Sequence, residues 1–241
     1  MGPAVTPFTA RAHAFVADLD APRLTGDDHH HLTRVLRLGP GSDVTVGDGA
    51  GRWRPARLAE SSEVVVAGDV VADARPDPPV TVAFALVKGD RPELTVQKLT
   101  ELGVDRLVPF VAERSVVRWE PAKAQRQAER LAGIARHAAM QCRRTWLPRV
   151  DPLASFADVA ALPGAALADR DGDPPTLAHP TALVGPEGGW APAERAVGLP
   201  VVGIGPLVLR AETAAVTFGA LLTAIRANIV AESQSVNARR G

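Results

Sequence analysis

The chain has 241 residues, of which 46% are apolar and 22% are charged, and its formal net charge at pH 7 is +0. This composition is ordinary for a soluble globular protein, and the length allows one large domain or a small domain followed by a medium one. The one cysteine, Cys142, excludes an internal disulfide and favours a reducing compartment. No apolar run is long enough to span a membrane and no signal-peptide pattern is present, so we expect a cytoplasmic protein without a membrane partner.

Residues 1–72 predict a small barrel-like β domain with one helix. Thr25 is typical of a helix N-cap, and Asp28 stands three residues later, where a capping box has its second member. The helix is expected to span residues 27–38 and to end at the Gly-Pro pair that follows. Short strands are expected over residues 13–19, 44–46, 52–58 and 64–71. The expected apolar face of the helix consists of Leu32, Val35 and Leu36.

A proline-rich segment, residues 73–79, is the predicted linker, because its prolines continue neither a helix nor a sheet ladder. Strands and helices then alternate over residues 80–233, which predicts an α/β domain with a mostly parallel sheet and helices on both faces. The strands are expected over residues 80–86, 106–111, 165–168, 181–184 and 201–204. The helices are expected over residues 92–102, 121–142, 156–162, 192–197 and 212–230. The polar tail, residues 234–241, is expected to fray.

Two glycine-proline turns each follow an apolar strand of this domain. The first reads G-P-E-G-G over residues 185–189, and the second begins at Gly205 and Pro206. We expect the two loops to lie side by side at the carboxyl edge of the sheet, where ligands of open α/β folds bind. Glycines let a backbone approach a ligand closely. From the residues alone, the loops predict a site for a nucleotide-like ligand.

The two loops, G-P-E-G-G and then L-R-A-E-T-A over residues 209–214, resemble the S-adenosylmethionine site of the SPOUT methyltransferases. The similarity is greatest to the family that methylates N3 of uracil in small-subunit ribosomal RNA, and it extends over nearly the whole chain, including K-G-D-R at residues 88–91 and E-R-S at residues 113–115. The resemblance implies a SPOUT-like parallel sheet with a C-terminal trefoil knot, preceded by a PUA-like RNA-binding domain. It also implies a homodimer, and 16S rRNA or the small ribosomal subunit as the partner.

The cofactor that the resemblance implies is S-adenosylmethionine, held by glycine-rich backbone and by apolar side chains against the adenine. The residues expected to bind it are Leu183, Gly185, Glu187, Gly188, Gly189, Ile204, Gly205, Leu207, Leu209 and Thr213. The alternative is structural, since tight turns at strand ends also use glycine and Thr213 could cap the last helix.

Catalysis at uracil N3 needs help in removing a proton, because N3 is a poor nucleophile while protonated. Arg210 is expected to donate hydrogen bonds to an oxygen on which the negative charge collects. A carboxylate in a partly buried pocket could accept the proton, and Glu212 is the predicted base, with Glu187 as a second candidate. The alternative for Arg210 and Glu212 is an ion pair that fixes the loop.

A local excess of positive charge favours contact with a phosphate backbone. Residues 113–149 contain nine basic and three acidic side chains in a chain that is neutral overall. The candidate RNA contacts are His31, Arg37, Arg114, Arg118, Arg136 and Arg144. A solvated helix face is the alternative. The histidine run at residues 29–31 lacks further ligands at suitable spacing, so no metal is expected.

Three other functions stay open at this point. The same fold and cofactor could serve another RNA base or a ribose hydroxyl. A non-enzymatic rRNA-binding assembly factor could keep the fold without the chemistry. A nucleotide hydrolase is disfavoured, because the chain has no G-x-x-x-x-G-K-[ST] loop.

Overall fold

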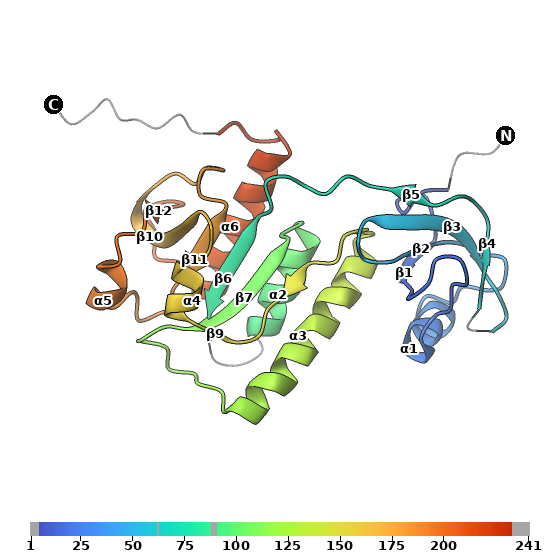
Figure 1. Cartoon of the computed structure of the whole chain (residues 1–241), viewed down its shortest axis with the longest axis horizontal. Helices are drawn as coiled ribbons and strands as arrows, with labels where there is room; N and C mark the ends of the chain where they lie inside the picture. The colour runs from blue at the N-terminus through green and yellow to red at the C-terminus, as the bar shows by residue number, and fades with distance from the viewer. Residues whose placement is uncertain (1–4, 62, 88–90, 233–241) are drawn as a thin grey trace. The chain divides into compact units, whose positions relative to one another are not determined.

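The computed structural model describes residues 5–61, 63–87 and 91–232. It divides into two compact units, Met1–Arg75 with Arg136–Leu147 and Pro76–Ala135 with Pro148–Gly241, which we call the first and second unit (Figure 1). The division after Arg75 falls inside the predicted linker, whereas residues 136–147, which the sequence assigns to the second domain, group with the first unit. Residues 88–90 and the tail expected to fray lie outside the described residues.

A five-stranded sheet organises the first unit. Its strands are β1 (Ala12–Phe15), β2 (Asp43–Gly47), β3 (Arg52–Leu58), β4 (Val64–Val66) and β5 (Val71–Ala72). They pair in the order β1-β2-β3-β4 with β5 also on β3, and every pair except β1-β2 is antiparallel. Within the described residues these pairings leave the sheet open, so the expected barrel stays a prediction. Ala139 and Met140 join the core of this unit beside Leu32 and Val46.

The helical segment of the first unit begins at the expected cap but does not keep the expected face. The Thr25 hydroxyl accepts a hydrogen bond from the Asp28 backbone at 3.1 Å and caps α1 (Gly26–His30), which continues into a π-helix, η1 (His31–Val35). Leu32 is buried as predicted, but Val35 and Leu36 are 60% and 44% exposed, so the apolar face was wrong for these two. The π-helix explains why these two side chains are exposed. Its i→i+5 hydrogen bonds put more residues into each turn than in an α-helix, so the side chains after Leu32 do not follow the 3.6-residue period of the predicted face.

The second unit is an α/β fold with a parallel sheet, as predicted. Its strands are β6 (Thr81–Ala85), β7 (Arg106–Val111), β8 (Arg149–Val150), β9 (Ala154–Ser155), β10 (Ala165–Asp173), β11 (Thr181–Val184) and β12 (Val201–Val202). The helices are α2 (Arg91–Glu101), α3 (Pro121–Gln141), α4 (Phe156–Ala160), α5 (Pro192–Arg195) and α6 (Ala211–Arg226). The strand order is β12-β10-β11-β6-β7-β8, with β9 also on β7, and every pair is parallel. The short strands β8 and β9 were not predicted.

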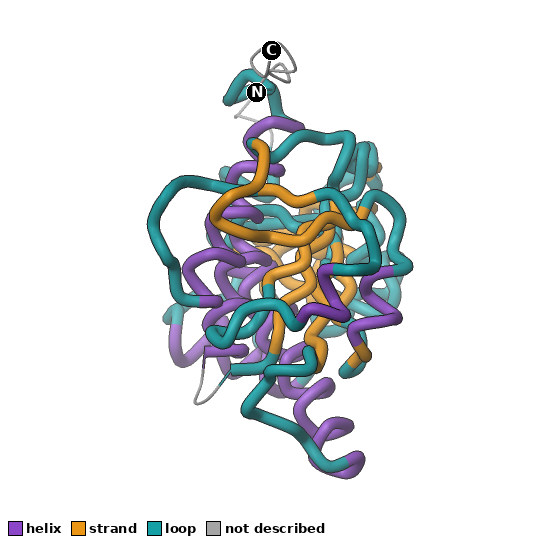
Figure 2. Tube along the Cα trace, turned by 90° about the vertical axis from the view of Figure 1, so that its left-hand side faces the viewer, coloured by secondary structure: helices purple, strands orange, loops and turns teal. Residues whose placement is uncertain are grey.

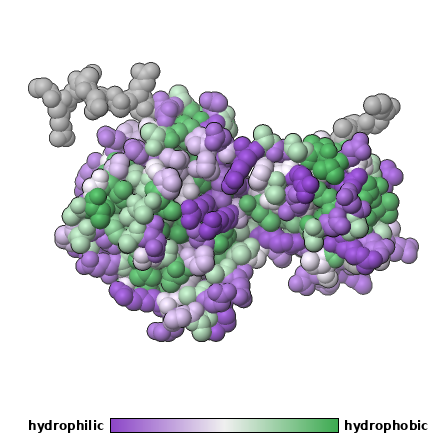
Figure 3. Space-filling view, in the orientation of Figure 1, coloured by the Kyte–Doolittle hydropathy of each residue, from purple (hydrophilic) through white to green (hydrophobic). Residues whose placement is uncertain are grey.

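Helices cover both faces of this sheet (Figure 2). Along β6, Val82 packs with Leu99 of α2 and Phe218 of α6, whereas the next residue, Ala83, packs with Val159 of α4. Successive side chains of a strand point to opposite faces, so one apolar strand serves two layers of helices. On the face visible in Figure 3, apolar and polar residues of this unit are interspersed. In the described part of the chain, no helix is both long and apolar enough to cross a membrane.

The strand order decides which loops meet. The first strand of the sheet in the chain is β6. The strands β7 and β8 lie on one side of it, and β11, β10 and β12 lie in that spatial order on the other side. Because β10 separates β11 from β12, the end of β10 lies between the two glycine-proline loops. The carboxyl ends of all three strands share one edge of the sheet, which is where ligands of such folds bind.

Candidate cofactor and active site

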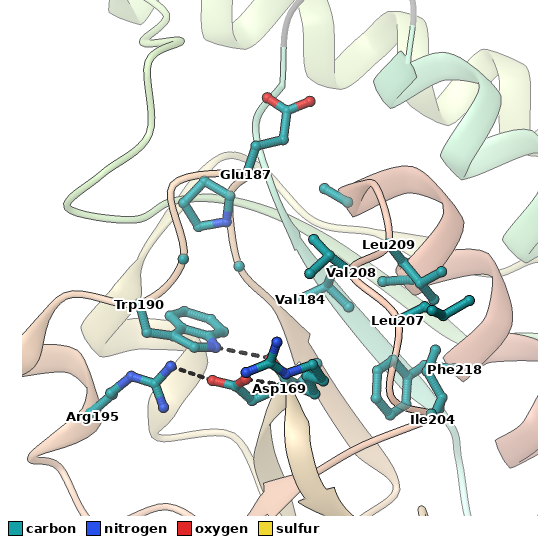
Figure 4. Close-up of a pocket in the computed structure, with 18 residues that line it drawn as sticks. Asp169, Val184, Glu187, Trp190, Arg195, Ile204, Leu207, Val208, Leu209 and Phe218 are labelled. Carbon is teal, nitrogen blue, oxygen red and sulfur yellow. Dashed lines mark hydrogen bonds and ion pairs between the residues drawn. The ribbon is translucent and has the colours of Figure 1, made fainter.

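A pocket opens at the carboxyl ends of β10, β11 and β12, and both predicted loops line it (Figure 4). The predicted cofactor residues in its wall are Gly185, Glu187, Gly189, Ile204, Gly205, Leu207 and Leu209. Figure 4 shows Trp190, Arg195 and Asp169 on one side of the pocket and Ile204, Leu207 and Phe218 on the other. The sheet therefore brings together two motifs that are some twenty residues apart in the sequence.

Three predicted cofactor residues lie elsewhere, since the wall as described does not include Leu183, Gly188 or Thr213. Leu183 is fully buried in the core cluster on the α4 face of the sheet, because it alternates with Val184, which does line the pocket. Gly188 is exposed in the first loop, and Thr213 is exposed on α6. The N-cap residue of α6 is Arg210 rather than Thr213.

Trp190 is the rigid part of the pocket wall. Its indole Nε1 donates to the carbonyl of Ala168 at 3.0 Å, and its ring stacks on Phe110 with centroids 6.2 Å apart. A Cβ added at Gly185 would lie 3.0 Å from the Trp190 ring, so a side chain here would have to displace that ring by a few tenths of an ångström. Gly189 and Gly205 have φ of 69° and 140°, which other residues rarely adopt.

The opposite wall is apolar and exposed. Leu207 and Val208 are 74% and 85% exposed, and Leu209 is 38% exposed. Apolar side chains beside backbone amides fit a ligand with a flat heteroaromatic ring and a sugar, such as S-adenosylmethionine. The donor set of this pocket therefore fits the expected cofactor.

Sequence reasoning missed several residues of the pocket. Asp169 and Arg170 follow the buried part of β10, and the Asp169 carboxylate forms an ion pair with Arg195 of α5. Trp190 and Ala168 were missed too, although a tryptophan directly after G-P-E-G-G is visible in the sequence. The position of β10 between the loops is what adds these residues, and strand order is not written in any local motif.

The predicted catalytic pair, Arg210 and Glu212, do not contact each other within the described residues. Arg210 is exposed between two lining residues of the pocket, Leu209 and Ala211. The Glu212 side chain is 14% exposed, and its Oε1 lies 3.6 Å from Nε of Arg91. The ion pair between Arg210 and Glu212, which was the structural alternative to their catalytic roles, is not formed within the described residues, and Glu212 pairs with Arg91 instead.

The first loop is also tied to the segment after β7. Arg114 Nη1 donates to the Gly188 carbonyl at 3.1 Å. The buried Glu194 carboxylate accepts from the backbone amides of Glu113 and Ala191, both at 2.9 Å. These contacts hold the E-R-S segment, residues 113–115, against the loop that carries Glu187.

The other candidate RNA contacts differ in how available they are. Arg118 and Arg37 are exposed, while His31 and Arg144 are half-buried. Arg136 donates to both oxygens of Asp28, at 2.8 and 2.6 Å, and to the Phe15 carbonyl at 3.0 Å. Arg136 is therefore engaged inside the first unit.

The hydrogen-bond donors around the Asp28 carboxylate favour its charged form. Burial alone would raise the pKa of the Asp28 carboxyl, but the hydrogen bonds from Arg136 and Thr25 outweigh it and hold that pKa below its ordinary value. Considering only the residues that the structure describes, no three His, Cys, Asp or Glu side chains are grouped so that they could hold a metal ion.

Comparisons with known proteins give the family of the chain. A family model described as an RNA methyltransferase domain matches residues 75–223, and one described as an RNA methyltransferase PUA domain matches residues 24–66. The ribosomal RNA small subunit methyltransferase E of Mycobacterium bovis is 33% identical over 221 residues, which cover 81% of this chain and 84% of that protein. The enzyme of the same name from Synechocystis is 34% identical over 214 residues, covering 79% and 69%.

A solved structure supports the same relationship. The chain is similar to the ribosomal RNA small subunit methyltransferase E from Neisseria gonorrhoeae bound to S-adenosyl methionine, with a TM-score of 0.72 and 26% identity. The match covers 89% of this chain and 97% of that one.

Proposed function

The chain belongs to the RNA methyltransferase family that contains the ribosomal RNA small subunit methyltransferases E, and we propose that it methylates N3 of a uridine in 16S rRNA. It is an S-adenosylmethionine-dependent rRNA methyltransferase, in keeping with its named relatives and with the S-adenosyl methionine bound in the similar Neisseria structure. The choice of uracil N3 is the finer proposal. It rests on the G-P-E-G-G and L-R-A-E-T-A loops that this chain shares with the uracil-N3 family.

The observation that carries the proposal is the meeting of those two loops in one pocket. Gly185 and Gly189 form one wall, and Gly205, Leu207 and Leu209 form the other. A turn with a purely structural role has no need of a second exposed apolar loop opposite it. The pocket wall supports cofactor binding by these residues and by Glu187 and Ile204. Binding by Leu183, Gly188 and Thr213, which lie outside that wall, rests on the resemblance of the loops alone.

When bound, the cofactor supplies an electrophilic methyl group. Glu212 would accept the proton that leaves N3, which would make the electron pair on N3 available as the nucleophile toward that methyl group. Arg210 donates hydrogen bonds to the uracil oxygen on which negative charge collects before transfer. The target base must be unpaired or flipped out, because N3 lies in its Watson–Crick face.

RNA binding by the first unit completes the proposal. Residues 1–72 act as a PUA-like RNA-binding domain and residues 80–233 as the SPOUT domain, joined by residues 73–79. His31, Arg37, Arg114, Arg118 and Arg144 contact mainly phosphate and so orient the substrate. Arg136 was proposed for the same role, and its contacts with Asp28 make it the weakest of the set.

Three further features follow from family membership and belong to the proposal. The strands β11 and β12 together with α6 form a C-terminal trefoil knot. The enzyme works as a homodimer in the cytoplasm. Its substrate partner is 16S rRNA or the small ribosomal subunit.

The test is methyl transfer from labelled S-adenosylmethionine to small ribosomal subunits from cells that lack this protein, followed by nucleoside analysis. Label in 3-methyluridine is the expected result. Label in another nucleoside or on a ribose would overturn the choice of uracil N3 but keep the enzyme class. Cofactor binding measured by calorimetry separates an enzyme from an assembly factor, because a pure RNA binder would take up no S-adenosylmethionine.

A further inference from the structure

One guanidinium contacts an acidic residue in the first cofactor loop and another just after the second loop. Arg91, the first residue of α2, places Nη1 2.5 Å from Oε1 of Glu187 and Nε 3.6 Å from Oε1 of Glu212. Glu187 belongs to the loop after β11, and Glu212 stands in the first turn of α6, after the second loop. Arg91 therefore joins two segments that are distant from it in the sequence and that carry the two candidate bases.

Close packing of α2 on α6 determines where Arg91 lies. A Cβ added at Gly219 of α6 would come within 2.5 Å of Leu99 Cδ2 of α2, so only glycine allows this approach. Leu99 is eight residues after Arg91, and Gly219 is seven residues after Glu212. Both helices follow parallel strands of one sheet and run in the same direction, so equal rises of about 1.5 Å per residue bring Arg91 and Glu212 to the same level.

The contacts of Arg91 contribute more to geometry than to stability. The side chains of Arg91 and Glu187 are 34% and 53% exposed, and ion pairs with such exposure stabilise a fold little. Glu212 is different, because its Oε2 is buried and has no hydrogen-bond donor within the described ranges. With Oε1 facing Arg91, Oε2 is the oxygen left to accept a proton.

We propose that Arg91 is a positioning residue of the methyl-transfer site, which clamps the Glu187 loop to the start of α6 and orients Glu212 so that Oε2 receives the substrate proton. This inference rests on the proposed function for its chemistry but not for its geometry. The clamp belongs to this chain's own residues and acts before any substrate binds.

Amide hydrogen exchange of the cofactor-free protein tests the clamp directly. Arg91→Gln should speed exchange in peptides that cover residues 185–191, and Glu187→Gln should do the same. The double variant should exchange no faster than Arg91→Gln alone, because both substitutions remove the same contact between Arg91 and Glu187. Lys98→Gln is the matched control, since it breaks a half-buried pair with Glu101 on the same helix, at 2.8 Å, and should leave the loop unchanged.

Single-turnover methylation tests the effect on chemistry. Arg91→Gln should lower the rate about 10- to 100-fold, because catalysis is sensitive to small displacements of a reacting group. Arg91→Lys keeps the charge but loses the planar fork, so it should restore part of the rate. If Arg91 had a merely structural role, both substitutions would lower the stability of the folded protein, and urea denaturation would detect this.

The results separate the clamp from the proposed reaction. Unchanged exchange in the 185–191 loop of Arg91→Gln, or additive effects in the double variant, would overturn the clamp whatever the enzyme methylates. If wild-type protein methylates no rRNA while Arg91→Gln loosens the loop, the clamp stands and the proposed function fails. Equal single-turnover rates for wild type and Arg91→Gln would overturn the orienting role toward Glu212.

Discussion

Replacing Arg136 by alanine should destabilise the first unit strongly. Its guanidinium donates four hydrogen bonds: two to the carboxylate of Asp28, which is 1% exposed, one to the Phe15 carbonyl and one to the Met140 sulfur. Removing Arg136 leaves a buried carboxylate without its cation, and breaking such a pair costs about 3–5 kcal/mol. A phosphate-binding arginine on the surface would cost at most about 0.5 kcal/mol on truncation.

Urea denaturation followed by tryptophan fluorescence and by amide exchange measures this difference. Two units need not unfold together, so exchange in peptides of residues 12–58 reports on the first unit specifically. Arg126→Ala is the control, because Arg126 is an exposed arginine of the same helix, α3, and should leave the midpoint almost unchanged. A wild-type midpoint for Arg136→Ala together with a clear loss of RNA affinity would refute the structural role and restore Arg136 as an RNA contact.

Three further predictions concern buried groups. Burial lowers the pKa of His13 from 6.5 to about 4, so the folded state keeps it neutral while the unfolded chain protonates it; stability is full above pH 6.5 and falls as the pH drops toward 4. At pH 5 the loss is about 2 kcal/mol, and His13→Gln should remove this part of the pH dependence in urea melts. Gly185→Ala forces a methyl group against the Trp190 ring, which is held in place by the hydrogen bond of its indole and by its stack on Phe110. The substitution should weaken S-adenosylmethionine binding, measured by calorimetry, about tenfold or more. An unchanged affinity would place the cofactor elsewhere. Arg226→Ala removes the buried partner of Asp105 and should lower the free energy of unfolding of the second unit by about 3–5 kcal/mol, whereas an unchanged urea midpoint would contradict that role.

The sequence predicted elements well where local pattern and burial agree. The strand β7 has the predicted bounds, α2 differs from its predicted bounds by one residue at both ends, and α3 ends one residue earlier than predicted. Prediction failed where the backbone departs from the regular period. The π-helix η1 moves Val35 and Leu36 to the surface, although an ideal helix would bury both with Leu32. The barrel and the knot depend on pairing and threading over long distances, and neither periodicity nor spacing carries that information.

The residues of the site likewise fall into those that a local sequence pattern predicts and those that depend on the tertiary structure. Gly185 could be found because it is a glycine directly after a strand, and Gly205 because it begins the second glycine-proline turn. Both residues line the pocket, where a glycine allows the backbone to approach a ligand closely. Asp169 could not be found in this way, because it reaches the pocket only through the position of β10 between β11 and β12. Arg91 is a harder case still. Its neighbours in the sequence say nothing about Glu187 or Glu212, and only the packing of α2 against α6 at Gly219 brings these charges together.

This division has a physical reason. A parallel sheet gathers the carboxyl ends of its strands at one edge, so two ligand-binding loops become neighbours in space although they are separated in the sequence. Their charges must then be balanced by residues that the helices deliver, and a helix can deliver a charged side chain only from its first turn, where it meets the same edge. Arg91 at the start of α2 and Glu212 at the start of α6 both satisfy that condition. The amino ends of helices that follow parallel strands are therefore the places to search for partners of loop carboxylates when a motif alone leaves them unassigned.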